Sequence, residues 1–186
     1  MSPSPALVWF RDDLRLADNP ALHAAQQSGR PLVLLYVLDE ESEGIRPLGG
    51  AARWWLGRAL AALAEAIEAK GGRLVLRRGK AREIVSSIAE ETGAGAVYWN
   101  RRYGAAEIAV DAALKTDLIA RGLSVESFNG SLLHEPWTVK TQSGGPFKVF
   151  SPFFRTAFRH ETRPLLATSL TWHFAEAPAG KELSDW

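Results

Sequence analysis

The chain has 186 residues, a net charge of +1, 46% hydrophobic residues and 23% charged residues, which suits one domain with a real core and room for an appendage. It has no cysteine, so disulfides and thiolate metal sites are excluded, and its four histidines lack metal-ligand spacing. The small net charge gives no general attraction to nucleic acid or anionic membranes. Because no apolar run could span a bilayer and "MSPSP" has no signal-peptide core, we expect a cytoplasmic protein.

The first predicted element is a strand over residues 6–10, "ALVWF", and four charges follow it at once: Arg11, Asp12, Asp13 and Arg15. Such residues can form alternating ion pairs that brace a loop, or they can line one wall of a pocket. Asn19 with Pro20 is typical of a helix start and predicts a helix that ends near Ser28.

The same alternation continues along the chain. Short buried-type runs predict further strands over residues 31–38, 73–77, 96–99 and, more weakly, 124–128. Apolar spacings of three and four residues predict helices between them, over 51–70, around 84–88 and around 108–118. In the first of these helices Trp55 lies near the apolar stripe and is expected in the core. Trp54, on another face, is expected under the C-terminal tail or exposed toward a ligand or partner.

Strict β-α alternation predicts a five-stranded, doubly wound parallel sheet of order 3-2-1-4-5, Rossmann-like, with helices on both faces. Ligands bind such sheets at the carboxyl ends of strands, where the strand order reverses. The loops at that point are residues 11–18 and 100–104, and Arg101, Arg102 and Tyr103 are expected to project into the crevice. No glycine-rich dinucleotide or phosphate-binding motif and no nucleophile elbow occurs, which argues against a dehydrogenase, a P-loop enzyme or an α/β-hydrolase.

After Phe128 the alternation stops. Residues 131–186 are rich in proline, glycine and aromatics, and one short helix is expected after Ser151-Pro152. We therefore divide the chain into an α/β domain, residues 1–130, and an irregular aromatic tail, residues 131–186. Exposed aromatic side chains in this tail would favour self-association.

Three segments together resemble one family. "LVWFRDDLRLADNPAL" at the start, "AVYWNRRYGAAE" after the fourth strand and "FNGSLLHEPWTVKTQSGGPFKVFSPFFR" in the tail are similar to the N-terminal region of DNA photolyases and cryptochromes, bacterial cyclobutane pyrimidine dimer photolyases in particular. The resemblance runs from about Ala6 to Arg155, and the order and spacing of the segments make it specific.

The resemblance implies an N-terminal antenna domain. In the family this domain carries a light-harvesting chromophore, which is a reduced folate, a deazaflavin or flavin mononucleotide. A larger helical domain binds FAD and damaged DNA and acts as a light-dependent carbon–carbon lyase. That domain is expected beyond Trp186, with residues 131–186 as the linker toward it. These 186 residues alone are then expected to lack FAD, catalytic residues and repair activity.

The resemblance, together with the topology, implies an antenna site at Arg11, Leu38, Asp39, Arg53, Asn100, Arg102 and Glu107. Glu107 matches a carboxylate that holds the pterin in folate-binding members, but Ala106 stands where those members have asparagine. Arg53 matches a chromophore contact of deazaflavin-type members, but Arg102 and Gly104 replace their acidic residues. Because Arg53 and Arg102 favour an anionic ring or a phosphate, a deazaflavin or flavin mononucleotide is expected over folate.

Two other functions fit the same residues. One is the N-terminal domain of a cryptochrome-type blue-light receptor, in which the domain lies beside a flavin sensor without repair. The other is a stand-alone nucleotide-binding α/β protein. The bacterial-like segments favour repair over signalling.

Overall fold

The computed structural model describes residues 3–167 and 171–181, which form two compact units. Residues 3–130 with 166–167 and 171–181 make an α/β unit, and residues 131–165 make a second, smaller unit. The tail predicted as one segment is therefore shared between the two units, while its role as an interdomain linker stays a prediction.

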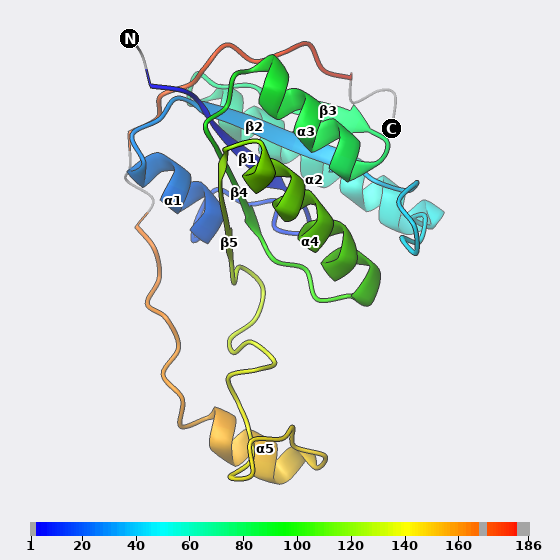
Figure 1. Ribbon diagram of the computed structural model, residues 1–186, viewed down its shortest axis with the longest axis vertical. Coiled ribbons are helices and arrows are strands. Elements are labelled where there is room, and N and C mark those ends of the chain that lie inside the picture. Colours follow the sequence, from blue (N-terminus) through cyan, green and yellow to red (C-terminus); the bar gives the residue numbers. More distant parts are fainter. Residues whose placement is uncertain (1–2, 168–170, 182–186) are drawn as a thin grey trace. The chain divides into compact units, whose positions relative to one another are not determined.

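The α/β unit is built on a parallel five-stranded sheet of order β3-β2-β1-β4-β5, which confirms the predicted topology (Figure 1). The strands are β1 (Ala6–Phe10), β2 (Leu32–Leu38), β3 (Leu74–Arg78), β4 (Ala96–Asn100) and β5 (Ser124–Phe128). Every residue of β1, β2 and β4 is buried, as expected for central parallel strands covered on both faces.

Helices alternate with the strands as the periodicity predicts. They are α1 (Pro20–Gln27), α2 (Gly50–Glu68), α3 (Ala81–Glu91) and α4 (Ala105–Ala120). The start of α1 confirms its sequence signal, because the Asn19 side chain accepts a hydrogen bond from the Leu22 amide and Pro20 occupies the first turn.

The alternation of side chains along the strands divides the core into two layers. Val8 and Phe10 of β1 pack with the buried residues of α1 and α2 on one face. Leu7 and Trp9 pack with those of α3 and α4 on the other. The two layers confirm the prediction of helices on both faces of the sheet.

The prediction that Trp55 belongs to the core was wrong: its side chain is 69% exposed, and that of Trp54 is 60% exposed. The first ten residues of α2 contain no buried side chain, and burial begins only at Leu60. The amino-terminal half of this helix touches the core through the partly buried Leu56, and Trp55 lies outside that contact.

Residues 171–181 return to the sheet. The Leu32 amide donates to the His173 carbonyl, and the Ala175 amide donates to the Leu32 carbonyl, at 2.7 and 3.0 Å. The Lys181 amide donates to the Leu76 carbonyl at 3.0 Å, so this segment covers part of the open edge of β3. Between these points the Phe174 ring lies where a side chain on Gly72 would be, which explains the glycine.

The smaller unit contains α5 (Phe150–Ala157), close to the predicted short helix. Its phenylalanines stack in sequence: the ring centroids of Phe150 and Phe154, and those of Phe154 and Phe158, are each 5.7 Å apart. Phe150 and Phe158 remain largely exposed. The prediction of self-association through these rings stays a prediction.

Candidate functional site

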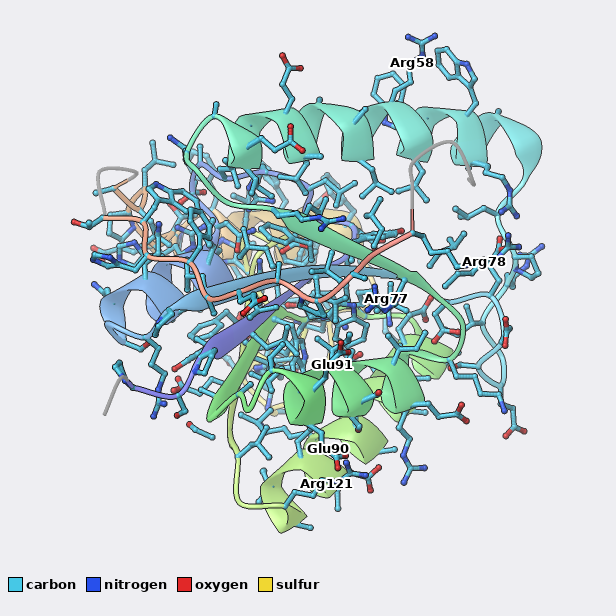
Figure 2. The ribbon with its side chains drawn as sticks, turned by 90° about the horizontal axis from the view of Figure 1, so that it is seen from above. Arg58, Arg77, Arg78, Glu90, Glu91 and Arg121 are labelled. Atoms are coloured by element: carbon cyan, nitrogen blue, oxygen red, sulfur yellow. The ribbon has the colours of Figure 1, made fainter. Side chains whose placement is uncertain are left out.

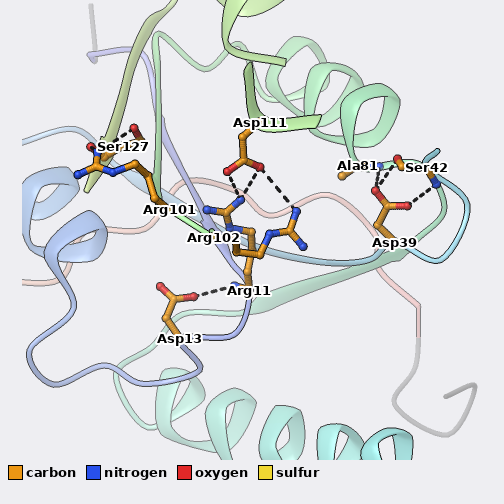
Figure 3. Close-up of polar contacts among 9 residues, drawn as sticks. All are labelled: Arg11, Asp13, Asp39, Ser42, Ala81, Arg101, Arg102, Asp111 and Ser127. Carbon is orange, nitrogen blue, oxygen red and sulfur yellow. Dashed lines mark hydrogen bonds and ion pairs between the residues drawn. The ribbon is translucent and has the colours of Figure 1, made fainter. Parts of the chain in front are cut away.

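The predicted ion pairs within the loop after β1 are not what holds it. Arg11 instead contacts Asp111 of α4, with its Nη1 atom 2.6 Å from both carboxylate oxygens (Figure 3). The side chain of Asp13 accepts the Arg11 amide and side-chain amide hydrogens of Asn19 and Asn100. Arg15 donates to backbone carbonyls. The charges thus contact different parts of the fold, which sequence proximity could not show.

Arg11, Asp111 and Arg102 form a buried cluster at the carboxyl ends of β1 and β4. The Arg102 Nη2 atom lies 3.6 Å from the Asp111 carboxylate, and both guanidinium groups lie over the Trp9 ring, 4.6 and 5.6 Å from its centroid. Burial lowers the pKa of Arg11, an effect that the Asp111 carboxylate opposes and Arg102 reinforces. Within the described residues, Nε and Nη2 of both arginines are buried without a hydrogen-bond partner. One carboxylate therefore serves two cations, the buried Arg11 and the half-buried Arg102.

The three residues expected in the crevice, 101–103, contact different parts of the fold. Arg101 donates to the backbone carbonyl and hydroxyl of Ser127 in β5, and Tyr103 contacts Asn129. Among these three residues, Arg102 is the one that lies beside Arg11 (Figure 3).

The loop after β2 contains a second cluster, around Glu40. One Glu40 oxygen accepts from Arg53 at 2.6 Å and from the Leu48 amide at 2.9 Å, and the other lies 3.2 Å from Arg78. Burial alone would raise the pKa of Glu40, but the Leu48 amide and the two arginines outweigh it and hold the pKa below its usual value. Arg53 is thus engaged with a carboxylate of its own chain.

Asp39 connects this loop to α3. Its carboxylate accepts from the hydroxyl and amide of Ser42, from the Ala81 amide at the start of α3, and from the Glu41 amide (Figure 3). These hydrogen bonds outweigh the effect of burial, and the pKa of Asp39 is lowered. Its contacts therefore hold the loop and cap the helix.

The other predicted site residues are also engaged within the fold. Leu38 is buried at the end of β2, and Asn100 donates to Asp13 and Asn19 and accepts from the Ala21 amide. The Glu107 carboxylate folds back over Gly104, where it would collide with a side chain. The structure thus forms two separate arginine–carboxylate–arginine clusters from Arg11, Arg102, Arg53 and their partners. Whether these residues bind a chromophore stays a prediction.

A cavity of about 510 Å³ lies at the carboxyl ends of β1 and β2, beside the first half of α2. Among the seven predicted site residues, Arg11 lines it. The remaining walls come from the loop after β1, from β2 and from α2: Asp12, Asp13, Leu14, Arg15, Tyr36, Leu48, Ala52, Trp55, Leu56 and Ala59. Sequence reasoning missed Tyr36 and Trp55. Two features of the sequence could have indicated these walls. Residues 52, 55, 56 and 59 share one face of a helix, and the alternation of side chains in β2 places Tyr36 on the same side of the sheet as Phe10.

Burial raises the pKa of Tyr36, and the negative charge of Asp12 adds to the effect. The phenol is therefore neutral at physiological pH. No three acidic or histidine side chains gather as a metal site in the part of the chain that the structure describes, and none of the helices in that part is long and apolar enough to cross a membrane.

Fold and cavity together define a doubly wound α/β protein with a ligand-sized hollow at the carboxyl ends of its strands. The sequence matches the DNA photolyase family over residues 6–170, and the chain belongs to that family. It is 51% identical over 155 residues to a deoxyribodipyrimidine photo-lyase of Agrobacterium fabrum, covering 83% of this chain and 32% of that protein. It is 39% identical over 152 residues to cryptochrome-1 of Arabidopsis thaliana, covering 80% and 22%.

Among solved structures, a class III photolyase from Agrobacterium tumefaciens superposes with a TM-score of 0.90 at 44% identity, covering 100% of this chain and 38% of that one. The chain therefore spans about a third of the length of these photolyases. Its higher identity to the photolyase than to the cryptochrome favours a photolyase domain.

Proposed function

We propose that this chain is the light-harvesting domain of a DNA photolyase, and that the whole protein uses blue light and reduced FAD to repair pyrimidine dimers in DNA. Family membership and 51% identity to a photolyase support the assignment. Because the chain spans about a third of that relative, the repair chemistry, FAD and damaged DNA are proposed for the whole protein. The role proposed for these 186 residues is to bind and orient an antenna chromophore.

The observation that carries this proposal is the cavity beside Trp55. Its volume of about 510 Å³ falls within the roughly 300–1,000 Å³ typical of small-molecule sites. One wall carries an indole ring and another the neutral phenol of Tyr36, while Arg15 and Asp12 supply charge from the loop after β1. Aromatic walls with a few polar groups suit a planar heteroaromatic ring, which is the part shared by pterins, deazaflavins and flavins.

When bound, such a group supplies absorption of near-UV or blue light. The protein supplies position and exclusion of water, so no catalytic residue is assigned in this chain. Arg15 lines the cavity and supplies a cation that suits an anionic ring or a phosphate, which supports a deazaflavin or flavin mononucleotide over a folate.

The test is a fluorescence titration of the full chain with a deazaflavin, flavin mononucleotide and a reduced folate. We expect one of them to bind, and we expect Trp55→Ala to weaken that binding about tenfold through loss of the aromatic wall. Trp54→Ala is the matched control, because Trp54 is also exposed but lies under the Arg58 guanidinium, 4.8 Å from its ring centroid. Figure 2 shows Arg58 on the outer side of α2, pointing away from the sheet.

Two outcomes would remove the assignment. One is that none of the three compounds binds the wild-type chain below roughly 100 µM, which is weak for a cofactor. The other is that Trp55→Ala and Trp54→Ala have the same affinity as wild type, which would mean that the ligand binds elsewhere.

A further inference from the structure

The loop between β1 and α1 contacts the two residues of the α/β unit that flank the smaller unit in sequence. Arg15 donates through Nη2 to the Gly130 carbonyl at 2.6 Å and to the Asp18 carbonyl at 3.0 Å. The Asp18 carboxylate accepts the Leu166 amide at 3.0 Å. Gly130 is the last residue before the smaller unit and Leu166 is the first after it. Two neighbouring side chains of one loop therefore connect the points at which the chain leaves and rejoins the α/β unit.

The backbone at both points is specialised for these contacts. Asp18 has a φ of +48°, and it is the one non-glycine residue with positive φ among those that the structure describes. Aspartate tolerates this left-handed conformation better than most residues, but glycine would adopt it without strain. Gly130 packs against Asn100, whose Cγ would lie 2.5 Å from a Cβ at this position. A glycine at position 18 would lack the carboxylate that accepts the Leu166 amide, and an aspartate at position 130 would collide with Asn100.

We propose that Arg15 and Asp18 form a two-point hinge: they fix where residues 131–165 leave and rejoin the α/β unit, and the smaller unit reorients as one body between these points. Residues 131–165 are compact, which supports their motion as one body. Because Gly130 and Leu166 are hydrogen-bonded to the loop after β1, this motion is limited to rotation and bending about two fixed ends. This role goes beyond chromophore binding and does not depend on it.

The first test measures amide hydrogen exchange at Leu166 in the full chain by NMR. Asp18→Gly removes the carboxylate acceptor and relieves the strain of the positive φ at this position. We expect amide exchange at Leu166 to accelerate about three- to tenfold, the usual effect of losing one hydrogen bond. Asp18→Asn keeps a side-chain carbonyl oxygen and tolerates positive φ, so its exchange rate should stay near that of wild type. Unchanged exchange in Asp18→Gly would overturn the proposal.

The second test measures the motion itself. The sequence has no cysteine, so spin labels can be placed on cysteines introduced at Ser87 of α3 and Ser151 of α5, both exposed. Arg15→Ala should broaden the distance distribution between the labels. Arg30→Ala is the control and should leave the distance distribution unchanged. Arg30 also donates to a backbone carbonyl, that of Ser4 at 2.9 Å, but this bond is far in sequence from Gly130 and Leu166.

Thermal unfolding of each variant checks that the α/β unit is intact. Should Arg15→Ala fail to fold, Arg15→Lys serves instead, since an ammonium keeps the charge but lacks the planar fork of donors. Distance distributions of equal width in the wild type and in the folded Arg15 variant would refute the hinge. A loss of chromophore binding with a normal hinge, or the reverse, would separate this proposal from the antenna assignment.

Discussion

Removing the Asp111 carboxylate should strongly destabilise the α/β unit. At an effective dielectric constant of about 20, unit charges 2.6 Å apart attract by about 6 kcal/mol and charges 3.6 Å apart by about 5 kcal/mol, and these are the distances from Asp111 to Arg11 and Arg102. Desolvation and repulsion between the two arginines subtract from this sum. Breaking a buried pair typically costs ~3–5 kcal/mol, because the remaining charge is left buried without a partner.

Asp111→Asn preserves the side-chain volume, so its effect reports charge. A loss of ~3–5 kcal/mol in a chain of this size lowers Tm by roughly 6–20 °C, which calorimetry or circular dichroism measures directly. Asp117→Asn, on the same helix, is the control: it breaks a two-pronged pair with Arg82 at 2.5 and 2.9 Å, but this pair is exposed and should contribute little.

The double variant Arg11→Met with Asp111→Leu gives a second check. Replacing a buried pair by apolar side chains of similar volume is often neutral. The double variant leaves one cation, Arg102, without its carboxylate, whereas Asp111→Asn leaves two, so the double variant should be more stable than Asp111→Asn. The reasoning fails if Asp111→Asn and Asp117→Asn shift Tm equally, or if the double variant is the least stable of the set.

Three further predictions follow from other contacts. The pKa of Asp39 is lowered in the folded state below an unfolded value near 3.9, so its contribution is present above that pH and is lost as pH falls through the folded pKa; urea unfolding of wild type should lose stability below about pH 4 more steeply than Asp39→Asn. Gly72→Ala should lower Tm by displacing the Phe174 ring, and Phe174→Ala in the same chain should restore part of the loss, whereas additive losses would contradict the contact. Arg53→Ala should weaken chromophore binding in a titration less than Trp55→Ala does, because Arg53 contacts Glu40 and does not line the cavity, and Arg58→Ala, on the outer side of α2, should leave binding unchanged (Figure 2).

The topology was predictable because it follows from alternation alone. Buried apolar runs separated by helical spacings, with right-handed crossovers, leave few arrangements, and the strand order is the one expected. The start of α1 needed a local signal only, Asn19 followed by Pro20. Trp55 could not be placed this way, because helical periodicity gives the direction of a side chain but not whether a sheet lies beneath that turn.

The candidate site was less predictable because its partners are distant in sequence. Arg11 and Asp111 are a hundred residues apart, and nothing near either one marks the other. Arg53 carried a signal, since a cation in the first turn of a helix is unfavourable with the macrodipole, and the structure shows the carboxylate that compensates it, Glu40. The cavity walls were missed because Tyr36 and Trp55 resemble ordinary core residues in sequence.

These contacts explain four charged residues of the loop after β1. Arg11 neutralises a carboxylate on α4, and Asp13 holds two asparagines near the carboxyl ends of β1 and β4. Arg15 and Asp18 contact the residues that flank residues 131–165. Because Arg15 also lines the cavity, the hinge and the proposed chromophore site share one side chain. A ligand that contacts Arg15 would then restrict it and slow amide exchange at Leu166, whereas binding without any change in that exchange would show that cavity and hinge act independently.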